Sequence, residues 1–124
     1  MRKIVFILSL LVTFSVYSQE KGKLSFNKEV IDFGELKEGD TAKKSLTFKN
    51  EGSQPVFIKK ISSTGHVNVE EYPMDEIQPN ANSKIVISYN TKVIGPIRRT
   101  LTIYSNAENP IISIKIKGKV LQKD

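Results

Sequence analysis

The chain has no cysteine among its 124 residues. This absence excludes disulfide bonds, thiol chemistry and a metal site with thiolate ligands. It also excludes the usual bacterial lipoprotein anchor, because no cysteine follows the apolar segment near the N-terminus. The fold therefore depends on its hydrophobic core, and a domain of about 100 residues is large enough to fold on that basis.

Histidine is nearly absent, since His66 is the single one. A Ser-His-Asp arrangement would have to combine this residue with a serine at 62 or 63 and a carboxylate at 70, 71 or 75. A zinc site would need about three converging ligands, with only carboxylates to join the one imidazole. Neighbouring residues on a strand point to opposite faces, and no nucleophile elbow is present. The acidic residues at 70, 71, 75 and 76 do not have the spacing of a calcium loop either. The sequence therefore predicts no catalytic residue, no cofactor and no metal site.

A long membrane-spanning run is also missing. The apolar segment Ile4–Val16 is shorter than the roughly 20 residues that cross a bilayer. It follows the basic segment Met1–Lys3, and Val16 and Ser18 occupy the −3 and −1 positions of a cleavage site. These features predict a secretory signal peptide over residues 1–18, cleaved near Ser18. We expect an exported protein, periplasmic or secreted, with no transmembrane segment after cleavage.

The remaining chain shows no internal repeat, no low-complexity tract and no helical period sustained over about ten residues. Short apolar–polar alternations are separated instead by turn signals every 8–12 residues or so. This pattern predicts an all-β, antiparallel immunoglobulin-like sandwich of about seven strands. We expect a flexible linker over residues 19–23, the sandwich over 24–121 and a C-terminal tail over 122–124.

The clearest strand is Ile111–Val120, which reads I-I-S-I-K-I-K-G-K-V. Its isoleucines from position 112 onward share one parity with Val120, and its lysines share the other. Successive strand side chains point to opposite faces, so this is expected to be an antiparallel strand with one buried face. If it lies at a sheet edge, it could pair with a strand of a partner protein.

The same parity argument predicts the core and several local features. The core residues are expected to be Phe33, Leu46, Phe48, Ile87, Leu101, Ile103, Ile114 and Ile116. We expect a break in the first strand near Asn27, a loop over Gly34–Asp40 and a bulge near Lys59–Lys60. Asn50 ends a strand, where its side chain can hydrogen-bond the turning backbone.

The formal net charge is +6, and most of the excess is lysine within strand patterns. One interpretation is that these lysines are solvated and protect sheet edges from pairing. The other is a basic patch that binds an envelope protein or an anionic envelope surface. Nucleic acid is not expected, because the chain has an export signal and lacks an interleaved aromatic–basic motif.

Two tyrosines and three lysines are the candidate interface residues. Tyr72 stands beside Pro73, and Tyr104 has the parity opposite to its buried neighbours. Surface tyrosine combines contact area with a polar group, although it can equally be a cross-strand packing partner. The predicted interface residues are Tyr72, Tyr104, Lys115, Lys117 and Lys119.

Several motifs, taken in order, resemble a known bacterial family. They read I-D-F-G-E-L-K-E-G-D-T, L-T-F-K-N-E-G-S-Q-P-V, I-S-Y-N-T-K, L-T-I-Y-S-N-A-E-N-P and I-K-I-K-G-K-V. Over Phe26–Val120 the chain resembles an exported domain-of-unknown-function family. That family is similar in fold to PapD-like, ASH and major-sperm-protein domains of immunoglobulin type. The resemblance implies a fold and an exported location, but no activity.

The chain departs from this family in one loop. Members often carry a C-G-C-T-like segment there, whereas this sequence has Thr64 and His66 in place of the cysteines. Any function that depends on a thiol pair is therefore excluded. Three hypotheses remain: a non-catalytic binding or structural module of the cell envelope, a chaperone-like strand-pairing protein, and a small metal-dependent enzyme that uses His66.

Overall fold

The computed structural model describes residues 21–124, so the predicted signal peptide lies outside the described residues. Eight strands form within the described part, and no helix there is long and apolar enough to cross a membrane. The strands are β1 (Leu24–Phe26), β2 (Val30–Lys37), β3 (Lys43–Asn50), β4 (Ile58–Ser63), β5 (Val67–Glu71), β6 (Asn82–Tyr89), β7 (Gly95–Ser105) and β8 (Ile111–Leu121).

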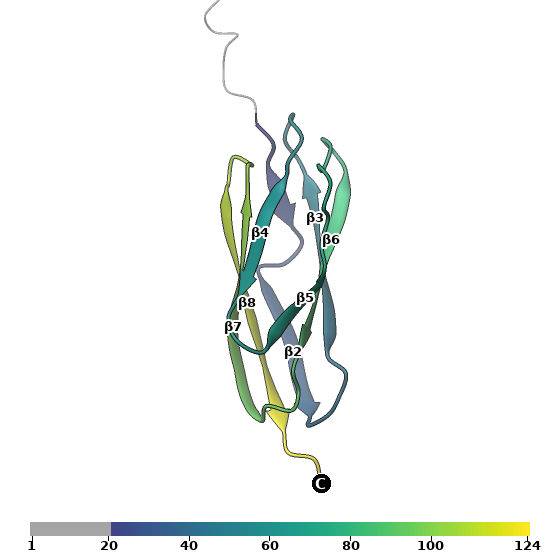
Figure 1. Cartoon of the computed structure of the whole chain (residues 1–124), viewed down its shortest axis with the longest axis vertical. Coiled ribbons are helices and arrows are strands. Elements are labelled where there is room, and N and C mark those ends of the chain that lie inside the picture. Colours follow the sequence, from purple (N-terminus) through teal and green to yellow (C-terminus); the bar gives the residue numbers. More distant parts are fainter. Residues whose placement is uncertain (1–20) are drawn as a thin grey trace, which may run out of the picture.

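The strands form two sheets of four, packed face to face along the long axis of the molecule (Figure 1). The first sheet has the order β1-β3-β6-β5, and the second has the order β2-β8-β7-β4. The described chain enters at one end of the sandwich and finishes at the opposite end. The predicted all-β immunoglobulin-like sandwich is therefore confirmed.

Five of the seven connections between consecutive strands pass from one sheet to the other, and the shortest two are β1–β2 and β4–β5. β1 belongs to the first sheet and β2 to the second, with Asn27 at the crossing. The Asn27 amide donates to the Thr47 carbonyl at 3.1 Å, and the Thr47 amide donates to Asn27 Oδ1 at 3.2 Å. This confirms the predicted break in the first strand. β4 and β5 cross in the opposite sense, from the second sheet to the first.

β8 is an interior strand, so its predicted place at a sheet edge is wrong. It pairs antiparallel with β7 over Ile111–Val120 and parallel with β2 from Lys115 onward. The alternation of its side chains shows which face of the strand is buried. It carries no information about which strands are hydrogen-bonded to β8 on either side.

The predicted loop Gly34–Asp40 is largely wrong as well. β2 continues through Gly34 to Lys37, with a register shift between Asp32 and Glu35. Gly34 adopts a positive φ of 68°, which is the conformation of a bulge and explains why its sequence resembled a turn. The true turn closes later, where the Asp40 amide donates to the Lys37 carbonyl at 2.9 Å. The bulge predicted near Lys59–Lys60 is confirmed, because the β4–β7 register shifts between Ile58 and Lys60.

All eight predicted core residues are buried between the two sheets. Asn50 is also fully buried, which makes it the notable polar member of the interior. Its side-chain amide joins three segments of the chain through hydrogen bonds.

Candidate binding face

Strand register gathers six cations on the outward side of the second sheet. Directly opposed residues on neighbouring strands share a face, and residues two apart on one strand share it too. Applied to the β4–β7, β7–β8 and β2–β8 pairings, this rule identifies one surface, here called the basic face. Its cations are Lys37, Lys60, Arg98, Lys115, Lys117 and Lys119, all of which are exposed.

The centre of the basic face places like charges next to each other. Arg98 on β7 stands directly opposite Lys117 on β8. Like charges in such a pair repel and destabilise the folded sheet slightly. Asp32 on β2 offsets this repulsion in part, since Lys117 Nζ lies 3.8 Å from Asp32 Oδ2. Both side chains of that ion pair are more than half exposed, so it contributes only about 0–1 kcal/mol.

Lys115 has no carboxylate opposite it on either neighbouring strand. Its cross-strand partners are Thr100 on β7 and Val30 on β2. An open depression of about 450 Å³ is lined by these three residues with Arg98 and Lys117. With Arg99, four cations thus line a depression that also has apolar side chains, an arrangement that attracts an anionic group next to an apolar one.

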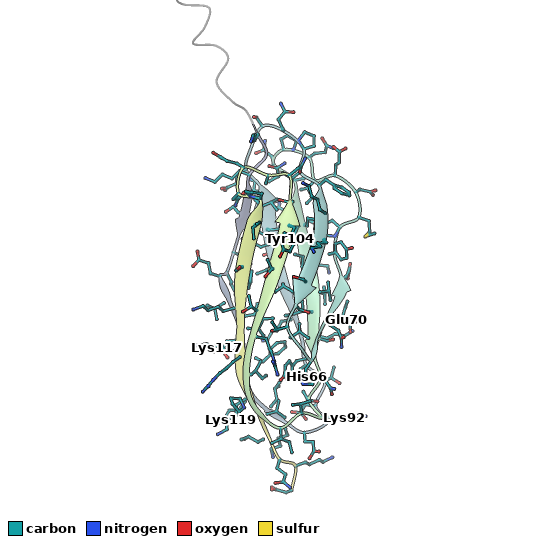
Figure 2. All side chains as sticks on the ribbon, turned by 60° about the vertical axis from the view of Figure 1, so that its left-hand side comes forward. His66, Glu70, Lys92, Tyr104, Lys117 and Lys119 are labelled. Atoms are coloured by element: carbon teal, nitrogen blue, oxygen red, sulfur yellow. The ribbon has the colours of Figure 1, made fainter. Side chains whose placement is uncertain are left out.

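The upper end of the basic face is aromatic and apolar. Tyr104 pairs with Ile111 on β8, and Lys60 Nζ lies 4.8 Å from the centre of the Tyr104 ring. Ile111 is 62% exposed, which is unusual for a large aliphatic residue on a strand. Figure 2 shows Tyr104 near one end of the sheet and Lys117 and Lys119 projecting outward farther along it.

Tyr72 lies elsewhere, although it was predicted as an interface residue together with Tyr104. It follows β5 of the first sheet and packs against the core as a half-buried side chain. It lines a separate groove with Lys49 and Lys84, which belong to the opposite side of the sandwich. The structure therefore brings together Tyr104 and the three lysines of β8, but not Tyr72.

Three members of the basic face were not predicted from the sequence as interface residues: Lys37, Lys60 and Arg98. The signal for Arg98 was present, because it shares parity with Tyr104, which was expected to lie opposite to its buried neighbours. Lys60 could not be assigned to a face, because the bulge before it reverses the parity of β4. Lys37 fell in a segment predicted as a loop.

His66 is a turn residue between β4 and β5. Its φ is +68°, its main-chain carbonyl accepts the Asn90 amide at 2.9 Å, and its ring meets Tyr89 edge-on at 6.4 Å. Ser63 Oγ donates to the Val67 carbonyl, and Glu70 accepts from Ser88 Oγ. These groups therefore do not form the triad considered from the sequence. Among residues 21–124, no group of three or more His, Cys, Asp or Glu side chains could hold a metal ion.

Comparison with known families identifies the family to which the chain belongs. The family described as "Protein of unknown function (DUF1573)" matches residues 24–120. The chain belongs to the DUF1573 family. The matched range covers nearly all of the described sandwich, so family membership applies to the whole domain that carries the basic face. The suspected resemblance to an exported domain-of-unknown-function family, with its PapD-like fold, is confirmed at the level of family and fold.

Solved structures show the same fold at low sequence identity. A protein of unknown function from Porphyromonas gingivalis W83 is 20% identical, with a TM-score of 0.73, over 86% of this chain and 50% of that one. The ASH/PapD-like domain 7 of human CEP192 is 12% identical, with a TM-score of 0.71, over 86% and 91%. The CupB2 chaperone of Pseudomonas aeruginosa is 12% identical, with a TM-score of 0.58, over 77% and 55%.

Identities this low establish a shared fold and nothing further about function. The chain spans half the length of the Porphyromonas gingivalis protein. No curated protein matches the sequence.

Proposed function

We propose that this DUF1573 chain is a non-catalytic, exported immunoglobulin-like module that binds an anionic partner of the cell envelope through its basic face. The observation that carries the proposal is the charge of that face. Six outward cations stand there with two carboxylates, Asp32 and Glu35. Such a concentration of one sign of charge attracts and orients an oppositely charged partner.

The opposite side of the sandwich provides the comparison. The outward positions of the first sheet carry Lys43, Lys49 and Lys84, with Glu70 and Glu71 nearby on β5. The charge there is nearly balanced, and no two of its lysines stand directly opposite each other. Binding of an anionic partner is therefore expected on the second sheet and not on the first.

The test compares two triple variants with the same change in net charge. The first, Arg98→Glu/Lys115→Glu/Lys117→Glu, reverses the basic face, and the second, Lys43→Glu/Lys49→Glu/Lys84→Glu, reverses the other face. Binding is measured to labelled polyglutamate by fluorescence anisotropy and to phosphatidylglycerol vesicles by co-sedimentation. Circular dichroism checks that both variants remain folded.

The proposal expects the first variant to lose about tenfold or more in affinity, from three charge contacts of about 0.5–1 kcal/mol each. The second variant should lose less than about threefold, because it changes only the long-range field. Equal losses in both variants would show that binding follows net charge alone. No binding of either probe by the unaltered chain would remove the proposal altogether.

A strand-pairing function is the second candidate, and one observation favours it. The Lys115 amide donates to the Glu29 carbonyl, so the main chain of the odd-numbered residues of β8 faces the β2 side. The pairing of β2 with β8 begins only at Lys115, and the preceding strand, β1, belongs to the first sheet. The main-chain groups of Ile111 and Ser113 consequently face an open stretch of edge among the described residues. Two of the similar folds are chaperones, CupB2 and YadV.

A proline at Ser113 tests this candidate. Ser113→Pro removes an amide that faces the open edge and leaves the β7–β8 hydrogen bonds in place. A photo-crosslinking side chain at Ile111 should form a discrete adduct in cells, which Ser113→Pro should abolish and Ser113→Ala should retain. An adduct that survives the proline substitution contradicts strand pairing at this edge.

A further inference from the structure

The outward side of β8 is a row of regularly spaced groups. Lys115, Lys117 and Lys119 alternate with the inward-facing positions of the strand, and each lysine lies two positions after the previous one. At about 3.4 Å per residue, the lysine positions repeat every ~6.8 Å. A row of charges with this period matches the side-chain period of another extended chain, in which alternate residues on one side repeat at the same distance.

The cationic area is also narrow. On the β2 side, Asp32 stands opposite Lys117, and Glu35 stands opposite Lys119. On the other side, β4 pairs with β7 only as far as Ser63–Leu101, so within residues 21–124 no strand extends the sheet beyond Arg98. Apart from Lys37 at the end of β2 and Lys60 on β4, the positive charge of the basic face therefore lies on β7 and β8. A flat anionic membrane would press its headgroups against Asp32 and Glu35, whereas a linear ligand along β8 avoids them.

One end of this row offers an apolar anchor. Ile111 shares its face with the lysines and lies four residues before Lys115, about 14 Å along the strand. Beside it stands Tyr104, held under Lys60 by the cation–π contact. The exposed Ile111 and the half-buried Tyr104 beside it provide contact area that a charged surface alone lacks.

We propose that the basic face binds an extended acidic peptide segment of a partner protein, with carboxylates at alternate positions and an apolar residue about four positions from the nearest carboxylate. The carboxylates lie over Lys115, Lys117 and Lys119, with Arg98 contributing a second cation at the central position. The apolar residue lies over Ile111 and Tyr104. This inference rests on the proposed function and specifies its partner class.

Arg98 strengthens the central position in a way that lysine alone would not. Its guanidinium can donate two parallel hydrogen bonds to one carboxylate, whereas a lysine ammonium acts as a point charge. Because Arg98 and Lys117 repel each other in the free protein, a carboxylate placed between them relieves that repulsion on binding. The central carboxylate should therefore contribute more to affinity than the two outer ones.

The experiment uses two labelled peptides of identical composition with the full-length protein. In one peptide, aspartates occupy every second position and an isoleucine lies four positions from the nearest aspartate. In the other peptide, the same aspartates are consecutive. Fluorescence anisotropy at low ionic strength should give at least about threefold tighter binding for the alternating peptide, since each additional aligned charge pair adds to the affinity.

Two single variants locate the site. Lys117→Gln should lower the affinity for the alternating peptide by about two- to fivefold and remove most of its preference over the peptide with consecutive aspartates. Lys84→Gln on the other sheet should leave the affinities for both peptides unchanged. Ile111→Ser should lower the affinity for the alternating peptide, whose isoleucine lies over this position. The affinity for polyglutamate, which has no apolar residue, should not change.

The outcomes separate this inference from the proposed function. If both peptides bind equally and the basic-face triple variant abolishes binding, the proposed function survives and the alternating register is wrong. If phosphatidylglycerol vesicles bind and neither peptide does, the ligand is a lipid surface and the peptide inference is overturned. If no anionic probe binds, both proposals fail.

Discussion

At the scale of single residues, Asn50 connects parts of the chain that are distant in sequence. Its Oδ1 accepts the amides of Lys23 and Gly52 at 3.1 and 3.0 Å. Its Nδ2 donates to the carbonyls of Gln54 and Ile77 at 2.8 and 2.9 Å. The sequence predicted a local hydrogen bond in a turn, and this is confirmed. The contacts with Lys23 and Ile77 were not predictable, because they depend on which loops meet at that end of the sandwich.

Replacing Asn50 tests how much this junction stabilises the fold. Asn50→Ala leaves two partly buried amides and two carbonyls without their side-chain partner, which should lower the free energy of unfolding by about 2–4 kcal/mol. Urea denaturation of the variant gives the value. Asn82→Ala, at an exposed strand position, is the matched control and should change stability by less than about 0.5 kcal/mol. A loss below about 1 kcal/mol for Asn50→Ala would show that the loops are held by other contacts.

Gly118 is the second residue whose identity the fold requires. Its φ is +151°, and a Cβ at this position would lie 2.9 Å from the Gly34 carbonyl oxygen and 3.1 Å from Phe33 Cβ. The bulged part of β2 therefore approaches β8 closely at this point. A side chain would strain the backbone and force the two strands apart.

Gly118→Ala should destabilise the protein by about 2–4 kcal/mol, through backbone strain and overpacking together. Gly65 supplies the control, because a Cβ there meets no atom within 4 Å. Thermal unfolding followed by circular dichroism compares the two variants. A Gly118→Ala protein as stable as Gly65→Ala would mean that β2 and β8 are not in this close contact.

At the scale of elements, the alternating side chains of β8 contribute both to stability and to the proposed binding. Its inward isoleucines fill the core, and its outward lysines form the row on the basic face. The pattern could be predicted from the sequence because it depends only on the two-residue period of a strand.

The two faces of β8 should respond differently to truncation. Ile114 is 1% exposed, so Ile114→Ala should lower the free energy of unfolding by about 2–5 kcal/mol through lost burial and a cavity. Ile111→Ala should cost less than about 0.5 kcal/mol. Guanidinium denaturation of both variants measures the difference, and similar losses at both positions would contradict the assigned faces.

The element-scale errors share a physical origin. Side-chain parity identified the buried residues of β3, β6, β7 and β8 correctly, since each runs without interruption through the sheet. Side-chain parity gave no indication of the parallel β2–β8 pairing. That pairing depends on the chain passing from the first sheet to the second between β1 and β2. The bulge at Gly34 hid the second half of β2, because glycine serves turns and bulges alike.

At the scale of the whole molecule, the excess charge is unevenly distributed. Register places six cations and two carboxylates on one face of the second sheet, while many other carboxylates lie in loops. The lysine row on β8 could be predicted from the sequence. Its combination with Arg98, Lys60 and Tyr104 could not be predicted, because it requires the register of three strand pairs and the bulge in β4.

This charge distribution leads to a prediction about salt. Exposed charge pairs are screened over about 10 Å at 0.1 M ionic strength. Polyglutamate affinity should therefore fall steeply between 50 and 300 mM NaCl, and the fall should be shallower in the Arg98→Glu/Lys115→Glu/Lys117→Glu variant. Anisotropy titrations at several salt concentrations measure both slopes. An affinity that does not depend on salt would contradict an electrostatic basis for binding.

The most direct test of the account is to map a ligand onto the two sheets by NMR. An amide chemical-shift titration with the alternating acidic peptide should perturb Arg98, Lys115, Lys117 and Lys119 while leaving Thr47 and Lys84 of the opposite sheet unchanged. Perturbations centred on the first sheet, or none on β7 and β8, would contradict the claim that the basic face is where this DUF1573 domain binds its partner.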